Sequence, residues 1–183
     1  MNETLKTIAE RYSCRDFADT PVTEEQLKFL ADAALAAPSG SNRQPWRIII
    51  VTDKNLIDEM DEEGLRMLKD AADQSAYERM MSRGGKLFYN APCLVMVTAP
   101  EGGAPMDCGI LCQNVALAAH SLGLGNIIVG MAGMPLSGPK GEEFKQRMQF
   151  PEGYGFGIGV LIGTANTVSA PHELDQSKVT YIR

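Results

Sequence analysis

The amino-acid sequence predicts an α+β fold that forms one domain over residues 1–183. Its 183 residues lie below the roughly 250 at which chains usually divide into several cores. Apolar residues make up 44% and charged residues 22%, which is typical of a globular chain. Segments with strand and helix patterns alternate without a strict βαβ rhythm. This order favours α+β, with a mixed α/β arrangement as the next alternative.

The first third of the chain contains two expected helices and one strand. The first helix is expected from Glu3 to Arg11, and Thr23 with Gln26 forms a capping box that begins the second. The apolar residues of this second helix share one face: Leu27, Leu30, Ala34 and Leu35. Turn-forming residues over 37–42 end it. The β-branched run over 47–52 then predicts a strand that is buried on both faces.

The remaining elements follow from apolar patterning. The charged segment Leu56–Met81 is expected to be one long, exposed helical excursion. The helix over Asp107–Leu122 is apolar nearly all round, so we expect it in the core or against a partner subunit. The other expected elements are strands at Cys93–Thr98, Asn126–Val129 and Phe156–Gly163, a short helix at Gly141–Met148, and a strand-forming tail at Val179–Ile182.

Charge and motifs argue against several functional classes. The formal net charge is −6 and no basic run is present, which disfavours nucleic-acid binding. No segment approaches the roughly 20 apolar residues of a membrane span, and the start lacks the order of a signal peptide, so a cytoplasmic protein is expected. The phosphate loop Gly-x-x-x-x-Gly-Lys, the Gly-x-Gly-x-x-Gly fingerprint and the Gly-x-Ser-x-Gly elbow are all absent. A hydrolase or a Rossmann dehydrogenase is therefore disfavoured.

The four cysteines do not have redox spacing. Cys108 and Cys112 are four residues apart, and a zinc site would require them to converge with His120 and His172. We favour the alternative that the thiols are buried small apolar groups, and we expect no metal site.

The segment after the first helix is a candidate anion site. In an extended chain Arg11, Ser13 and Arg15 point the same way, because side chains two apart share a face. Two guanidinium groups and a hydroxyl suit a phosphate. The alternative is a solvated loop in which the arginines pair with Asp16 or Asp19.

Two further segments could approach a ligand. Residues 37–46 combine small residues with the amides of Asn42 and Gln44, which suit the edge of a flat heterocycle. The alternative is a helix-to-strand turn with Trp46 in the core. The second segment, Gly123–Gly133, runs from a strand into a glycine-rich loop whose backbone a ligand could approach closely.

Polar residues on the apolar helix need partners. Asp107, Asn114 and Ser121 are spaced by seven, and hydrogen bonds to a facing helix are favoured over catalysis. His120 lies beside them and is not expected to act as an acid or base.

Taken in order, these segments resemble the nitroreductase family of FMN-dependent oxidoreductases. The matching motifs are Arg-x-Ser-x-Arg-x-Phe, Pro-Ser-x-x-Asn-x-Gln-Pro-Trp, the run from Asp107 through Gln113-Asn114 to Gly125, and Phe150-Pro151-Glu152-Gly153-Tyr154. The resemblance spans nearly the whole chain and implies an intertwined homodimer. In such a dimer a mostly antiparallel central sheet is flanked by helices, the C-terminal tails are exchanged, and FMN lies at the interface.

The resemblance also assigns roles by position. Arg11 and Ser13 would hold the phosphate and ribityl chain, and Arg15 the pyrimidine end of the flavin. The remaining expected contacts are Pro38, Ser39 and Gly40 from the other subunit, Asn42 and Gln44 nearby, and the backbone of Val129, Gly130 and Met131 near the flavin N5. Many members carry a Lys/Arg pair in the tail. Here His172 or Lys178 would replace it, or the phosphate would be held less tightly.

The implied activity is ping-pong hydride transfer from NADH or NADPH, through FMN, to a nitroaromatic, quinone or similar flat acceptor. The chemistry would be that of FMN, with no catalytic side chain. One alternative is an FMN-binding redox sensor or flavin store. A weaker one is a phosphate- or nucleotide-binding module that carries no flavin. Nothing in residues 56–81 matches a feature that the resemblance could transfer.

Overall fold

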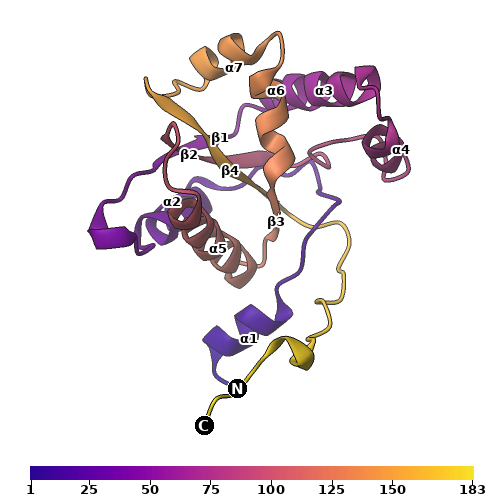
Figure 1. Ribbon diagram of the computed structural model, residues 1–183. Helices are drawn as coiled ribbons and strands as arrows, with labels where there is room; N and C mark the ends of the chain where they lie inside the picture. The colour runs from indigo at the N-terminus through magenta and orange to yellow at the C-terminus, as the bar shows by residue number, and fades with distance from the viewer.

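The fold is built on a four-stranded antiparallel sheet (Figure 1). The computed structural model describes residues 1–183. The strands are β1 (Arg47–Val51), β2 (Cys93–Pro100), β3 (Gly125–Val129) and β4 (Tyr154–Gly163). They are arranged in the order β1-β2-β4-β3, so β1 and β3 form the two edges. The predicted α+β class and the predicted antiparallel sheet are confirmed.

Helices cover both faces of the sheet, as Figure 1 shows. One face carries α2 (Glu24–Leu35) and α5 (Pro105–Ser121), and the other carries α3 (Lys54–Asp70), α6 (Met134–Ser137) and α7 (Gly141–Arg147). Strand β2 is buried on both sides because its apolar residues alternate between two core clusters. Cys93, Val95 and Val97 face α2 and α5. Leu94 and Met96 face the opposite cluster.

Several local predictions are confirmed in detail. Helix α1 spans Glu3–Glu10, and the capping box of α2 forms as expected, with Thr23 and Gln26 exchanging hydrogen bonds. The strand cores expected at 47–52, 93–98, 126–129 and 156–163 are present, but β1 is a half-buried edge strand rather than one buried on both faces. Strand β4 begins two residues earlier than predicted, since Tyr154 and Gly155 pair with Pro100 and Ala99 of β2.

The prediction for residues 56–81 is wrong in two respects. The segment forms two helices, α3 and α4 (Ser75–Met81), rather than one, and Asp73 accepts the Ser75 N–H where the second begins. Helix α3 is also part of the core. Its buried face carries residues that recur every three or four positions: Leu56, Ile57, Met60, Gly64 and Leu68. The charged residues that suggested an exposed excursion lie mainly on the opposite face.

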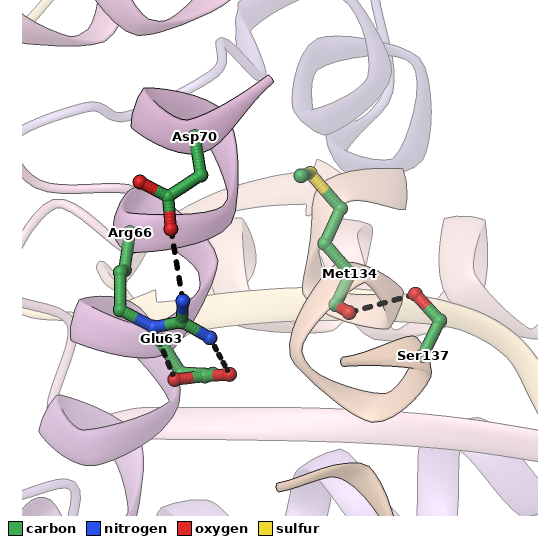
Figure 2. A network of polar contacts seen from close by, with 5 residues as sticks. All are labelled: Glu63, Arg66, Asp70, Met134 and Ser137. Atoms are coloured by element: carbon green, nitrogen blue, oxygen red, sulfur yellow. Dashed lines mark hydrogen bonds and ion pairs between the residues drawn. The ribbon is translucent and has the colours of Figure 1, made fainter. Parts of the chain in front are cut away.

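A charged network lies where α3 approaches α6 (Figure 2). The Glu63 side chain is only 3% exposed and pairs with Arg66 at 2.7 Å, and Arg66 also reaches Asp70 at 2.9 Å. The hydrogen bonds from Arg66 lower the pKa of Glu63. Gly138, in the turn after α6, leaves room for this carboxylate, because a Cβ there would lie 3.2 Å from Glu63 Oε1. The network therefore stabilises a buried charge between two helices.

Two surfaces remain uncovered within the chain. Helix α5 buries one face, and Met106, Gly109 and Gln113 on its other face are exposed in the single chain. The tail after β4 forms no strand, contrary to the prediction for Val179–Ile182; it contains only a short 3₁₀ turn at Gln176–Lys178. Apolar side chains on both surfaces lack a partner in the single chain.

None of the helices combines the length and the apolar character that crossing a bilayer requires.

Candidate functional site

The three residues of the predicted anion site line one pocket. Arg11, Ser13 and Arg15 border a hollow of about 210 Å³, and Ser169, Ala170 and His172 of the tail close its other side. Backbone pairing positions the row, because Ser13 bridges Asn126 of β3 and the Cys14 N–H donates to the Asn126 carbonyl at 2.9 Å. The pocket is therefore fixed to the edge of the sheet.

Hydrogen bonds bring the tail to this place. Phe17 bridges Ala165, the Ala18 N–H donates to the Thr164 carbonyl at 2.9 Å, and the Tyr12 hydroxyl donates to the Thr167 carbonyl at 3.3 Å. These contacts run the start of the tail alongside residues 12–18. Residues 169–172 consequently lie over the arginine row. This placement favours His172 over Lys178, whose ammonium group lies 3.8 Å from Asp175.

The arginines of the pocket do not pair with acidic side chains. The ion pairs of the structure involve neither Arg11 nor Arg15. The Arg15 guanidinium instead donates to the Ser13 carbonyl at 3.3 Å, and the Asp16 carboxylate accepts from Asn166 at 3.0 Å. The structure therefore does not show the alternative, a solvated loop in which the arginines pair with Asp16 or Asp19. Two positive charges remain available to an anion.

The segment Pro38–Gln44 forms a constrained loop before β1. Ser41, Asn42 and Gln44 have φ values of 53°, 53° and 47°, which non-glycine residues adopt rarely. Hydrogen bonds hold this shape. The Gln44 N–H donates to Ser39 Oγ at 2.9 Å, and the Gln44 amide donates to Asn42 Oδ1 at 3.0 Å. The Gly40 N–H donates to Asp107 Oδ1 at 3.1 Å, which ties the loop to the start of α5.

The end of β3 presents an open stretch of backbone. A Cβ built at Gly130 meets no atom within 4 Å, so a ligand could approach this backbone without displacing protein. Val129 and Met131 are half-buried on either side. Asn126 and Gly130 lie four residues apart, about 13 Å along an extended chain. The anion pocket and this glycine therefore border the same edge strand at a separation that an elongated ligand could span.

The structure does not bring the 38–44 loop to the anion pocket within one chain. The loop is tied to Asp107 at the start of α5, whereas Tyr12 beside the pocket makes an edge-to-face contact with His120 near the helix end, with ring centroids 6.4 Å apart. The helix rises about 20 Å between these two positions. One chain thus places the two predicted parts of the flavin site at opposite ends of α5.

The polar residues of α5 have mainly structural partners, as predicted. Asp107 accepts from the 38–44 loop, and the Asn114 amide donates to the Ala33 carbonyl of α2 at 3.1 Å. Ser121 differs from the prediction, because its hydroxyl bonds the Ala118 carbonyl of its own helix at 2.8 Å.

The cysteines behave as small apolar groups. All four are buried and unpaired, and burial raises the pKa values of Cys93 and Cys112 to about 12. Neutral thiols of this kind are poor metal ligands and poor nucleophiles.

The side chain of one buried polar residue beside the pocket is not among the predicted site residues. Asn126 is 1% exposed, and neither its amide nitrogen nor its amide oxygen has a hydrogen-bond partner. The sequence shows only an asparagine that begins an apolar strand. A polar residue at a position that β-pairing would bury was the available signal.

Known proteins combine this fold with these motifs. The sequence profile of the nitroreductase family matches residues 8–163, so the chain belongs to the nitroreductase family. A nitroreductase with bound FMN from Desulfitobacterium hafniense is 54% identical, and the two structures superpose over 100% of both chains with a TM-score of 0.97.

Two curated relatives carry flavin in their names. An FMN reductase [NAD(P)H] from Bacillus subtilis is 28% identical, over 100% of this chain and 76% of its own length. An NADPH-flavin oxidoreductase from Vibrio harveyi is 32% identical, over 71% of this chain and 54% of its own. The chain therefore spans about half the length of the Vibrio relative. The predicted family and fold are confirmed.

Proposed function

We propose that the chain acts as a homodimeric FMN oxidoreductase. It takes hydride from NADH or NADPH and passes electrons to a nitroaromatic, quinone or similar flat acceptor in a ping-pong sequence. As a nitroreductase-family member it is an NAD(P)H-dependent flavin oxidoreductase, and FMN is its cofactor. FMN, when bound, supplies the hydride and electron transfer itself. The side chains bind, orient and cover it.

The observation that carries the proposal is the unneutralised cationic pocket beside the open backbone of β3. Arg11, Ser13 and His172 suit the phosphate and ribityl chain, because guanidinium and hydroxyl groups donate to phosphate oxygens. Arg15, in the same pocket, suits the pyrimidine end, where a cation favours the negative charge of a reduced flavin. The open space at Gly130 suits a flavin ring approaching the backbone of Val129–Met131.

A second subunit would supply the rest of the site. In a two-fold dimer with antiparallel α5 helices, the 38–44 loop of one subunit would approach the arginine row of the other. The exposed face of α5 supports this packing: Met106 is 77% exposed, and a Cβ at Gly109 meets nothing within 4 Å. Pro38, Ser39 and Gly40, with Asn42 and Gln44 nearby, would then cover the flavin ring from the partner.

The tail supports the same assembly. Tyr181 and Ile182 are 73% and 91% exposed, which is unfavourable for large apolar side chains that lack a partner. The outer edge of β1 has no neighbouring strand and borders a groove of about 590 Å³. A tail strand from a second copy would pair with this edge. The pairing would cover both the edge of β1 and the apolar side chains of the tail.

Gly109→Arg tests the dimer and the shared site together. The single chain tolerates the change, since the position is exposed and arginine favours helix more than glycine does. A charged side chain on the α5 interface should convert the dimer to monomer in sedimentation experiments, and FMN binding should fall with it. Ala72→Arg, in the exposed bend before α4, is the matched control. A Gly109→Arg protein that stays dimeric with full FMN affinity contradicts the proposed interface.

A further inference from the structure

Asn126 occupies an unusual position in β3. It is 1% exposed, and neither the nitrogen nor the oxygen of its amide has a hydrogen-bond partner. Buried polar groups are nearly always paired in folded proteins, because an unpaired group loses its bonds to water without replacement. An apolar residue would fill the same place at lower cost. The amide therefore requires an explanation beyond packing.

The strand pairing identifies its polar neighbour. Asn126 pairs with Ile162 of β4 on one side and bridges Ser13 on the other. Residues paired across adjacent strands present their side chains on the same face, about 4.8 Å apart. Ile162 offers no hydrogen-bonding group, whereas the Ser13 hydroxyl can donate one hydrogen bond and accept two. Ser13 is thus the polar side chain that the pairing sets beside the buried amide.

Ser13 also lines the cationic pocket with Arg11 and Arg15. A serine hydroxyl helps an anion only when its proton points toward the anion, and a free hydroxyl rotates among several directions. A donor on the opposite side of the oxygen would remove this freedom. The Asn126 amide nitrogen is such a donor, and its strand holds it in place.

We propose that Asn126 is a positioning residue for the anion pocket. Its Nδ2 group donates to Ser13 Oγ when an anion is bound, so that the Ser13 hydroxyl donates to the anion. The inference deepens the proposed function, on which it rests for the identity of that anion as the FMN phosphate. It also explains why a buried strand position carries an amide.

Asn126→Leu is the central test, since it keeps a side chain of similar size and removes the donor. FMN and riboflavin affinities are measured by quenching of flavin fluorescence, riboflavin serving as the ligand that lacks the phosphate. We expect Asn126→Leu to weaken FMN binding about tenfold, comparable to the loss of one hydrogen bond to a charged group. Riboflavin binding should not change. Asn126→Asp should also weaken FMN, because a carboxylate accepts the hydroxyl proton rather than donating to Ser13.

A double-mutant cycle separates positioning from structure. Ser13→Ala should weaken FMN by a similar factor, and the Ser13→Ala/Asn126→Leu double variant should be no weaker than either single variant. The apoprotein with Asn126→Leu should unfold at the same temperature as the wild type or a higher one, because an unpaired buried amide is replaced by an apolar group. A structural role would instead lower this temperature and weaken both flavins equally.

Three results would overturn the inference: unchanged FMN affinity in Asn126→Leu, equal losses for FMN and riboflavin, or additive losses in the cycle. A wild-type chain that binds no FMN would instead contradict the proposed function. In that case inorganic phosphate is the probe. Stronger thermal stabilisation of the wild type than of Asn126→Leu by phosphate supports the positioning role, and equal stabilisation, or none in either protein, rejects it.

Discussion

Removing both arginines of the cationic pocket should abolish tight FMN binding. Each guanidinium–ligand hydrogen bond contributes about 1.5–3 kcal/mol, because the donor is charged. Because the pocket opens to solvent, the lower value applies to each arginine, and the sum is about 3 kcal/mol. Since 1.4 kcal/mol corresponds to a factor of ten, the Arg11→Ala/Arg15→Ala variant should bind FMN about 100-fold more weakly.

Fluorescence titration with FMN and riboflavin measures this loss and separates the two roles. Arg11→Ala alone should weaken FMN binding and leave riboflavin binding unchanged, because Arg11 is assigned to the phosphate. Arg15→Ala should weaken both flavins, because it is assigned to the pyrimidine end. Arg83→Ala, at an exposed turn after α4, is the charge-matched control. Full FMN retention by the double variant would refute the site assignment.

Three further changes test other parts of the structure. His172→Ala should weaken FMN binding severalfold and Lys178→Ala should not, because only His172 lines the pocket. The reverse result in the same titration would assign the phosphate contact to Lys178. Gly130→Val should leave thermal stability unchanged, since a Cβ there meets no protein atom, yet slow flavin reduction in stopped-flow absorbance; unchanged kinetics would count against a flavin contact at this backbone. Burial raises the pKa of Asp61, which accepts the Phe88 N–H, so the folded chain holds this proton at pH values where the unfolded chain has lost it. The wild type should therefore lose unfolding free energy relative to Asp61→Asn as pH rises above about 4, and parallel denaturation profiles at every pH would exclude this linkage.

The sheet and its helices could be predicted largely from local patterns. The capping box at Thr23 and the β-branched run before Thr52 depend on neighbouring residues, and both are found where expected. The prediction for α3 is wrong because its many charged residues conceal an apolar stripe, which appears only when residues are grouped by helical turn. The tail and the open face of α5 have no partner within the single chain, and the dimer that we propose would cover both surfaces.

The candidate site was predictable to a similar extent. Alternation in an extended chain places Arg11 and Arg15 on one side, and both line the pocket. The approach of His172 depends on hydrogen bonds between segments about 150 residues apart, which no local pattern encodes. The burial of Asn126 follows from its two strand neighbours, so it too requires the fold.

An anaerobic absorbance spectrum of the FMN-reconstituted protein tests the central claim most directly, recorded before and after addition of NADH and then NADPH. The account predicts flavin bands that bleach within seconds and return when a quinone or nitroaromatic is added. Bands that persist with both nucleotides would contradict the oxidoreductase and indicate a flavin-binding sensor or store. A protein that takes up no FMN would leave only the anion pocket.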